Sequence, residues 1–282
     1  MKLSKRSAEI FIPDGTSMPK AVRRTTVMCV AAHHDDIEIM APRQIIDCFG
    51  RRDRWFFGVV ATNGAGSPRC NIYAKYTDKQ MQAVRRDEQR KAALVGEFGA
   101  LAMLDHPSRA IKKANNPVVI EDISLLIHMA KPHTVVMHNL ADKHDTHVAL
   151  ALRTLEALRS LPSADRPKKV YGGEVWRDLD WMLDDDKVLW DVSSQQNLQA
   201  SLLGVFDSQI SGGKRYDLAA AGRRRAHATY NQSHSVDVTE AMAVGMDLTP
   251  LVKNRKLDPF AYVDGLLSRF RDDVKARIER FQ

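Results

Sequence analysis

Long apolar runs are scarce in this sequence of 282 residues. The apolar run at residues 27–32 is far shorter than the roughly 20 residues that a membrane-spanning helix needs. The basic start (Lys2, Lys5 and Arg6) is not followed by the apolar segment of a signal peptide. We therefore expect a cytoplasmic protein without membrane association.

Cysteine and concentrated charge are also lacking. Three cysteines (Cys29, Cys48 and Cys70) without a C-x-x-C pair argue against a disulfide framework and a structural zinc knuckle. The 42 Lys+Arg exceed the 35 Asp+Glu by a net charge of +7, but acidic residues lie close to most basic clusters. Such dispersed charge argues against a nucleic-acid surface and fits a modest attraction for anionic substrates.

The first half of the chain alternates strand-like and helix-like segments. The residue patterns predict strands at 25–32, 55–62, 100–104 and 133–138, and helices at 38–49, 78–98, 118–129 and 145–158. In particular, Asp78 is expected to cap the helix that it begins. This alternation predicts βαβ units, and therefore an α/β fold with a mostly parallel central sheet.

The second half is less regular. We expect strands at 169–175 and 187–192, helices at 198–206 and 216–229, and an amphipathic helix at 262–281 packed on the body. Because no internal repeat or low-complexity linker occurs, one continuous domain is predicted. It is divided into an N-terminal extension (1–24), a catalytic core (25–210) and a C-terminal helical segment (211–282).

Ionisable residues gather directly after the first expected strand. They are His33, His34, Asp35, Asp36 and Glu38. In open parallel sheets, ligands bind beyond the carboxyl ends of the strands, which is where this cluster falls. A purely structural explanation is that Asp35 or Asp36 caps the following helix. That explanation accounts for one carboxylate and leaves the imidazoles unexplained.

A second cluster follows the fourth expected strand. It contains His138, Asp142, His144 and His147. If Asp145 or Thr146 caps the next helix, His144 and His147 both face the same crevice. Two clusters rich in His and Asp at strand ends favour a bound metal.

Two imidazoles and one carboxylate with an open fourth position form a catalytic zinc set. His33, Asp36 and His147 provide this set and leave Asp35 and His144 free. A free carboxylate can accept the proton of a metal-bound water, and an imidazole can stabilise an oxyanion or protonate a leaving amine. The same ligands can also hold Fe²⁺, Co²⁺ or Mn²⁺.

Both clusters match known motifs. Residues 33–38, H-H-D-D-I-E, resemble the H-P-D-D-x-E motif of the PIG-L (LmbE-like) family of zinc-dependent N-acetylglucosaminyl deacetylases, and residues 144–147, H-D-T-H, resemble its H-P-D-H motif. The resemblance implies a Rossmann-like three-layer sandwich with its metal site at the C-terminal ends of the strands. It also implies one zinc ion per chain held by His33, Asp36 and His147, with Asp35 as general base and His144 assisting the tetrahedral intermediate.

Weaker matches extend the resemblance over residues 25–209. Residues 62–64 resemble the family's T-x-G loop, Arg85 with Glu88 its R-x-x-E helix, and residues 207–209 its Ser-Gln near the end of the catalytic region. We assign Arg85, Asn63 and Asp142 to substrate binding.

Three departures from the family pattern affect these expectations. His34 replaces a proline, which is expected to loosen the loop. Residues 40–43, M-A-P-R, replace small residues and two glycines, so we expect them to narrow the crevice or reshape the sugar pocket. Asp145-Thr146 replaces Pro-Asp and removes a carboxylate that supports a histidine, for which Asp142 is a candidate substitute.

The function expected is removal of the N-acetyl group from an N-acetylated amino sugar or glycoconjugate by a zinc-activated water. The expected partner is this small-molecule substrate, and a homo-oligomer is compatible with the sequence. Three alternatives stay open: another metal-dependent amidase, a phosphoesterase with a second metal, and a non-catalytic sugar-binding relative.

Overall fold

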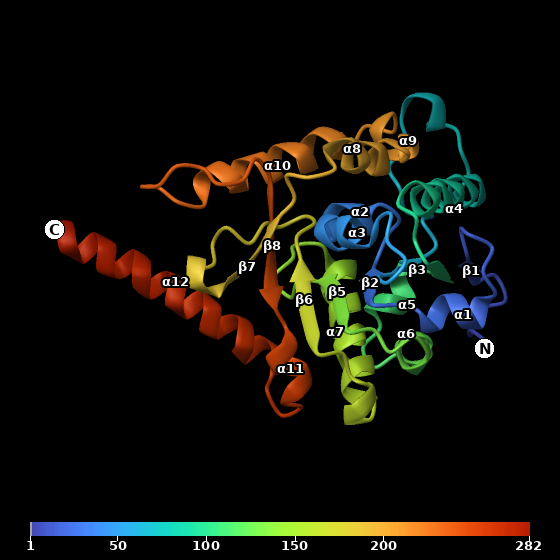
Figure 1. The fold of residues 1–282 in the computed structure, drawn as a ribbon, viewed down its shortest axis with the longest axis horizontal. Coiled ribbons are helices and arrows are strands. Elements are labelled where there is room, and N and C mark those ends of the chain that lie inside the picture. The colour runs from blue at the N-terminus through green and yellow to red at the C-terminus, as the bar shows by residue number, and fades with distance from the viewer. Residues whose placement is uncertain (1) are drawn as a thin grey trace.

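Eight strands form one sheet in the computed structural model, which describes residues 2–282 (Figure 1). The order of the strands across the sheet is β1-β4-β3-β2-β5-β6-β8-β7. The strands are β1 (Glu9–Phe11), β2 (Val27–Ala31), β3 (Phe56–Thr62), β4 (Ala100–His106), β5 (Thr134–His138), β6 (Lys169–Gly173), β7 (Lys187–Asp191) and β8 (Met242–Asp247). The five from β4 to β6 in this order are parallel, whereas β1, β8 and β7 pair antiparallel. The predicted α/β fold is confirmed.

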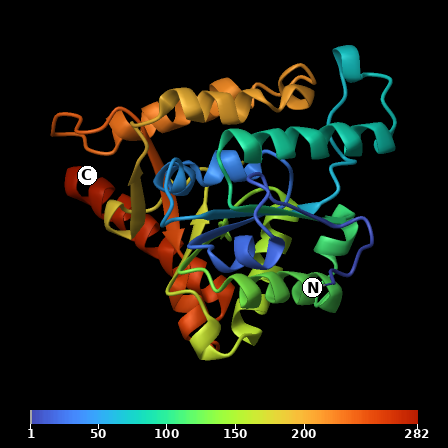
Figure 2. The ribbon, with the colours of Figure 1, turned by 45° about the vertical axis from the view of Figure 1, so that its right-hand side comes forward.

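Helices cover both faces of the sheet (Figures 1 and 2). Successive strand residues point to opposite faces, so Val30 packs into one apolar cluster and Cys29 into another. The first cluster includes residues of α1 (Met18–Arg23), α5 (Ser108–Lys112), α6 (Pro117–Ala130), α7 (Asp145–Ser160), α11 (Thr249–Lys253) and α12 (Pro259–Phe281). The second includes residues of α2 (Asp36–Met40), α3 (Pro42–Cys48), α4 (Asp78–Val95) and α8 (Gln196–Gly204). The result is a three-layer sandwich.

The strand order places two loops side by side. β2 pairs with β3 on one side and with β5 on the other, and both pairs are parallel. The chain therefore leaves β2 toward β3 and returns to the opposite side of β2 at β5. At such a switch point the loops that follow the two strands diverge and leave a crevice. Residues 33–38 and 138–147 span these two loops and the first turns of the helices that follow, and His138 is the last residue of β5.

The helix predicted at 38–49 is in fact two helices. α2 ends at Met40 and α3 starts at Pro42, with Ala41 between them outside the helical conformation. Proline has no backbone N–H to donate, so it fits the first turn of a new helix better than the interior of a long one. The predicted cap of α4 was also wrong. Thr77, not Asp78, caps the helix in a reciprocal capping box with Gln80.

Both ends of the chain contribute to the sheet. The N-terminal extension supplies β1, which pairs with β4. The C-terminal segment, expected to be helical, supplies α10 (Tyr216–Tyr230), α11 and α12, but also β8, which lies between β6 and β7. The expected packing of the last helix on the body is confined to its start, because Leu266 is the buried residue of α12. Phe270, Val274 and Ile278 are exposed. Within residues 2–282, no helix has the length and apolarity that crossing a membrane would require.

Candidate metal centre and cavity

Asp35 sits in the turn between β2 and α2. Its φ of 86° is left-handed, a conformation that aspartate tolerates better than most residues. Asp35 occupies the N-cap position of α2, yet its side chain makes no capping hydrogen bond. It pairs instead with Arg85, whose Nη2 lies 3.1 Å from Oδ2. The purely structural explanation, in which this carboxylate caps the helix, was therefore wrong.

Three side-chain atoms from the two loops form a small triangle. Nδ1 of His33 lies 3.2 Å from Oδ2 of Asp36 and 3.0 Å from Nε2 of His147, and the third edge, from His147 Nε2 to Asp36 Oδ2, measures 3.3 Å. Ligands bonded tetrahedrally to zinc at 2.0–2.1 Å are separated from one another by about 3.3 Å. The donor set and its spacing fit a zinc-sized cation.

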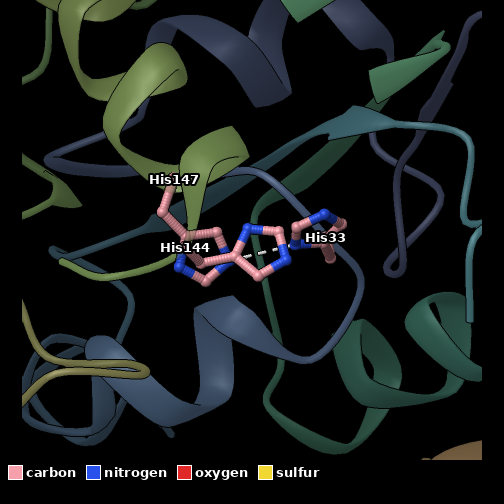
Figure 3. Close-up of side chains that lie close together, drawn as sticks. All are labelled: His33, His144 and His147. Carbon is pink, nitrogen blue, oxygen red and sulfur yellow. Dashed lines mark hydrogen bonds between the residues drawn. The ribbon is translucent and has the colours of Figure 1, made fainter. Parts of the chain in front are cut away.

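Two further histidines pack against this triangle. The rings of His33, His144 and His147 lie close together in Figure 3: the centroid of His144 is 5.0 Å from that of His33, which is edge-on to it, and 4.5 Å from that of His147, on which it stacks. His138 stacks on His147 at 3.9 Å. The donor atoms fall into two overlapping groups with metal-ligand spacing, one of His33, His144 and His147 and one of Asp36, His138 and His147.

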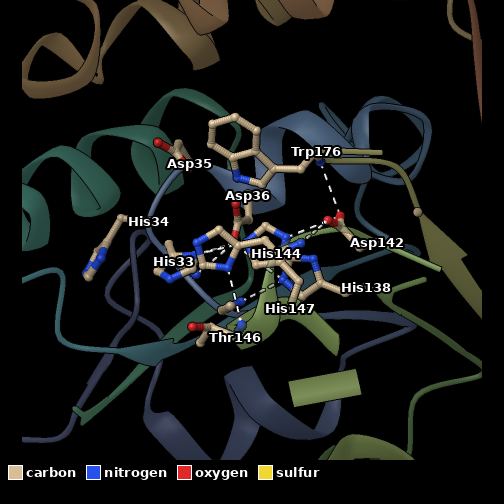
Figure 4. A network of polar contacts seen from close by, with 12 residues as sticks. His33, His34, Asp35, Asp36, His138, Asp142, His144, Thr146, His147 and Trp176 are labelled. Atoms are coloured by element: carbon tan, nitrogen blue, oxygen red, sulfur yellow. Dashed lines mark hydrogen bonds and ion pairs between the residues drawn. The ribbon is translucent and has the colours of Figure 1, made fainter. Parts of the chain in front are cut away.

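Hydrogen bonds indicate which ring nitrogens carry lone pairs (Figure 4). His138 Nε2 accepts the backbone N–H of Ala32 at 2.9 Å, and His144 Nδ1 accepts that of Thr146 at 3.3 Å. His144 thereby caps α7, in place of the predicted Asp145 or Thr146. His147 Nδ1 lies 3.3 Å from Oδ2 of Asp142, so it carries the proton and leaves the Nε2 lone pair facing the triangle.

Burial and neighbouring charges shift the pKa values of these groups. Burial would lower the pKa of His147, but the carboxylates of Asp36 and Asp142 raise it to about 9. Burial would likewise raise the pKa of Asp36, but His147 and His33 hold it well below its usual value. Burial lowers the pKa of His138 to about 4. A positive charge is therefore stabilised between His33, Asp36 and His147 and is unfavourable on His138, which stacks on His147.

The pKa of Asp35, the carboxylate next to Asp36 in the chain, shifts in the opposite direction. Burial, opposed by Arg85 and reinforced by Asp36, raises the pKa of Asp35 to about 7. The Arg85 guanidinium is 2% exposed and also donates to the His34 carbonyl and to Ser208 Oγ. Glu88, one turn further along α4, accepts hydrogen bonds from both N and Oγ of Ser208 at 2.6 Å. The weak motif matches at Arg85, Glu88 and Ser208 thus converge beside Asp35.

A cavity of about 420 Å³ opens onto this centre. Its lining includes the predicted residues His33, Asp35, Asp36, Arg85 and His144, together with Thr62, Gly64, Gly66, Ser67, Pro68, Ser108, Lys112, Thr146, Trp176, Gln209, Lys214 and Tyr216. Gly64 is required here, because its φ is +74° and an added Cβ would lie 3.0 Å from Arg85 Cβ. Larger hollows of about 900 and 820 Å³ elsewhere on the protein contain none of the metal-binding groups.

Two residues assigned to substrate binding lie outside the cavity lining. Asn63 accepts the backbone N–H of Ala65 and shapes the loop. Asp142 is 7% exposed and lies behind His147. It also accepts the backbone N–H of Trp176 at 3.1 Å. Asp142 thus provides the carboxylate that the motif lacks at Thr146.

Two of the motif departures are placed differently from expectation. None of residues 40–43 lines the cavity. Met40 is buried against the backbone of Gly173, and Arg43 pairs with Asp47 on α3, so the expected narrowing of the crevice is wrong. His34 does not loosen its loop, because it is 2% exposed and its carbonyl accepts a hydrogen bond from Arg85.

Sequence reasoning assigned no site role to three residues that support the site. His138 belongs to the second cluster but had no assigned role. Gln89, fully buried on α4, accepts the backbone N–H of Asp35 through Oε1 at 3.1 Å and donates to Glu38 through Nε2 at 2.8 Å. Trp176 stacks beside His144 at 6.2 Å. Gln89 lies four residues after Arg85 on the same helix face, and this spacing was the one available signal.

The model of the PIG-L family, described as GlcNAc-PI de-N-acetylase, matches residues 28–158. This range includes both loops of the metal centre and Arg85. No curated protein is similar enough in sequence to be matched.

Several solved structures share the fold at low sequence identity. The N,N'-diacetylchitobiose deacetylase of Pyrococcus horikoshii is 13% identical, with a TM-score of 0.64 over 82% of this chain and 86% of that one. The 4-carboxy-2-hydroxymuconate hydratase of Pseudomonas putida is 14% identical, with a TM-score of 0.59 over 79% and 96%. The deacetylase of the A40926 pseudoaglycone is 15% identical, with a TM-score of 0.56 over 79% and 97%.

Proposed function

Since residues 28–158 form a PIG-L domain, we propose that this chain is a zinc-dependent hydrolase that removes the acetyl group from an N-acetylated amino sugar or glycoconjugate. One observation carries the proposal. The triangle formed by His33, Asp36 and His147 lies at the cavity beside Asp35, a buried carboxylate outside the triangle.

The hydrogen bonds divide the four histidines into two roles. His33 and His147 present ring nitrogens to Asp36 and act as metal ligands with it. His138 and His144 each use one lone pair to accept a backbone N–H. The Nε2 of His138 is therefore not available to a metal, and the neutral His144 carries its proton on Nε2. We assign His138 to positioning the ring of His147, on which it stacks.

Zinc in this site would lower the pKa of a bound water to about 7 and polarise a carbonyl oxygen. Asp35 accepts the proton of the attacking water. Arg85 binds its Oδ2, and within residues 2–282 no protein donor binds its Oδ1, which is the oxygen that takes the proton. His144, which lines the cavity, donates a hydrogen bond from Nε2 to the developing oxyanion, and the proton taken up by Asp35 passes to the leaving amine.

A two-metal phosphoesterase fits the site less well. The second group of donors shares both Asp36 and His147 with the triangle, and its remaining member is His138, whose Nε2 already accepts the backbone N–H of Ala32. Within residues 2–282 there is thus no separate set of bridging carboxylates for a second ion, which two-metal sites normally use.

The fold alone does not choose the reaction, since one relative of similar TM-score is a hydratase. Metal analysis combined with an acetate-release screen over N-acetylated sugars tests the proposal. We expect one zinc ion per chain and acetate from at least one N-acetylated sugar. An intact zinc site without acetate release from any of them would overturn the hydrolase assignment and favour a sugar-binding protein or another reaction.

The base assignment has its own test. Asp35→Asn should retain the metal and lose about 10²–10⁴ in kcat, the usual contribution of a general acid or base. Asp145→Asn is the matched control, because Asp145 is an exposed carboxylate of the second motif. Full turnover by Asp35→Asn on a substrate that the wild type deacetylates would exclude Asp35 as the base.

A further inference from the structure

The cavity contains positive charge that no protein carboxylate neutralises. Of its charged lining residues, Asp35 pairs with Arg85, and Asp36 faces His33 and His147. The remaining charged residues of the lining are Lys112 and Lys214. The lysines of residues 2–282 that form ion pairs are Lys131, Lys187 and Lys275. Two ammonium groups at the cavity therefore have no acidic partner.

Lys214 is held close to the reacting groups. Its ammonium nitrogen lies 4.9 Å from the ring centroid of Trp176, and Trp176 stacks beside His144 with centroids 6.2 Å apart and planes inclined by 23°. The ring of Tyr216 lies almost perpendicular to that of Trp176, with the two ring centroids 6.1 Å apart. The backbone N–H of Lys214 also donates to the carbonyl of Gln209 at 2.7 Å. A cation on an aromatic face is attracted to it without losing its charge.

Lys112 approaches the centre from the other side. It ends α5, which follows β4, whereas Trp176 follows β6. In the sheet, β4 and β6 flank the three strands that carry the metal centre and its neighbouring loop. The two lysines therefore come from opposite sides of the switch point, so their positive electrostatic potentials add at the cavity between them.

The products of deacetylation give a second reason to expect an anionic group on the substrate. Hydrolysis of an N-acetyl group leaves an amine, which is protonated at neutral pH. Asp35 already pairs with Arg85, and Asp36 belongs to the metal-binding triangle, so neither carboxylate is free to neutralise the ammonium group of a plain amino sugar beside Lys112 and Lys214. A substrate that brings its own anion avoids this repulsion.

We propose that the substrate carries an anionic substituent, a carboxylate or a phosphate, and that Lys214 binds it beside Trp176, with Lys112 adding to the attraction. This inference rests on the proposed function, because it concerns the substrate of the same site. It makes Lys214 a specificity-determining residue.

The test compares neutral and anionic substrates of one sugar. N-Acetylglucosamine is the neutral probe, and N-acetylglucosamine 6-phosphate and N-acetylmuramic acid are the phosphate and carboxylate probes. We expect kcat/KM to be about tenfold higher for at least one anionic probe, since one ion pair of this kind is worth about tenfold in affinity. The preference should shrink at about 0.5 M salt, where charges at the cavity entrance are screened.

Lys214→Met should remove most of this preference, because it should raise KM for the anionic probes by a larger factor than it changes kcat/KM for the neutral probe. Lys169→Met is the matched control, because Lys169 is an exposed lysine at the start of β6, whereas Trp176 follows the end of that strand. Equal kcat/KM for neutral and anionic probes in the wild type, or an equal effect of Lys214→Met on both, would overturn the inference.

A binding measurement separates this inference from the proposed function. Calorimetry on the zinc-loaded protein compares glucosamine 6-phosphate with glucosamine, and neither needs turnover. Tighter binding of the phosphate that Lys214→Met abolishes supports the anionic subsite even if no probe releases acetate, a result that would defeat only the proposed hydrolase. Equal binding of both sugars overturns the subsite.

Discussion

Asp35 is held in its left-handed conformation by contacts on both its backbone and its side chain. Its N–H donates to Gln89, its carboxylate binds Arg85, and both partners are buried residues of α4. Left-handed backbone at a residue other than glycine costs of order 1 kcal/mol or more and persists where the surroundings enforce it. The position of the proposed base therefore depends on a helix that follows the next strand of the sheet.

Replacing Gln89 tests this dependence. Gln89→Met leaves the N–H of Asp35 and a carboxylate oxygen of Glu38 without their partners. We expect the free energy of unfolding to fall by about 1–3 kcal/mol, and kcat to fall while zinc content is unchanged. Urea unfolding and metal analysis measure both, with the more exposed Gln82→Met on the same helix as control. Wild-type stability and turnover in Gln89→Met would contradict the positioning role.

Asp142 supports a metal ligand in the same manner. Its Oδ2 faces Nδ1 of His147, so it fixes the tautomer that leaves Nε2 free. Asp142→Asn should weaken zinc binding about 10–100-fold, the usual effect of losing such a partner. Competition with a chromogenic chelator measures this change. Unaltered zinc affinity in the variant would show that His147 is oriented by other contacts.

At the scale of the elements, periodicity predicted the βαβ part of the fold but missed two strands that are set by tertiary contacts. β1 has three residues and exists through its pairing with β4. β8 contains Gly245, which is unfavourable in a strand but necessary here, because an added Cβ would lie 2.4 Å from Trp190. Neither requirement is visible in a local sequence window.

In the site, too, the features visible in the local sequence were predictable and those that depend on tertiary contacts were not. Residues 33–38 and 144–147 were predictable because several ionisable side chains adjoin an expected strand end. The roles of His138 and Gln89 were not, since each depends on one backbone N–H that only the folded chain brings near. The misjudged effect of residues 40–43 has a similar cause. Whether a bulky side chain faces a cavity or a core depends on the break between α2 and α3.

Asp122 connects α6 with β4 and with the N-terminal segment before β1, and it gives a pH-dependent prediction. It accepts hydrogen bonds from Ser4 and contacts Nε2 of His106, at the end of β4, at 3.0 Å. Burial would raise the pKa of Asp122, but the hydrogen bonds from His106 and Ser4 lower it below 3.8. A carboxyl whose pKa is lowered by folding stabilises the protein above its unfolded-state pKa, and this contribution disappears as the pH falls through the folded-state value.

We therefore expect Asp122→Asn to be less stable than the wild type near pH 7, and the difference to shrink as the pH falls below about 4. Urea unfolding of both proteins between pH 7 and pH 3 measures the difference. A difference that stays constant over this range would show that the charge of Asp122 contributes nothing.

At the scale of the whole molecule, the outer part of α12 carries little of the stability. Leu266 is its buried residue, and the side chains beyond Arg269 are partly or fully exposed. Removing residues 271–282 should lower the free energy of unfolding by less than about 1 kcal/mol, whereas Leu266→Ala should cost about 2–5 kcal/mol. Thermal unfolding of the two variants compares them. A truncated chain as unstable as Leu266→Ala would show that the exposed stripe supports the fold.

Metal removal should also act on the whole molecule. A ligand that binds only the folded state stabilises it by about 4 kcal/mol at a thousand times its Kd. Chelation of the zinc-loaded protein should thus lower Tm by several degrees, and His147→Ala should show a smaller drop because it binds less metal. An equal drop in both proteins would place the stabilising ion elsewhere.

The triangle joins chain positions 33 and 147, and its two loops become neighbours through the pairing of β2 with β5. A nascent chain that stops short of β5 contains two of the three ligands and cannot enclose the ion. Capture of zinc during refolding should therefore coincide with the closure of the longest loop between adjacent strands of the parallel core. The time course of zinc binding during refolding can therefore report when that loop closes.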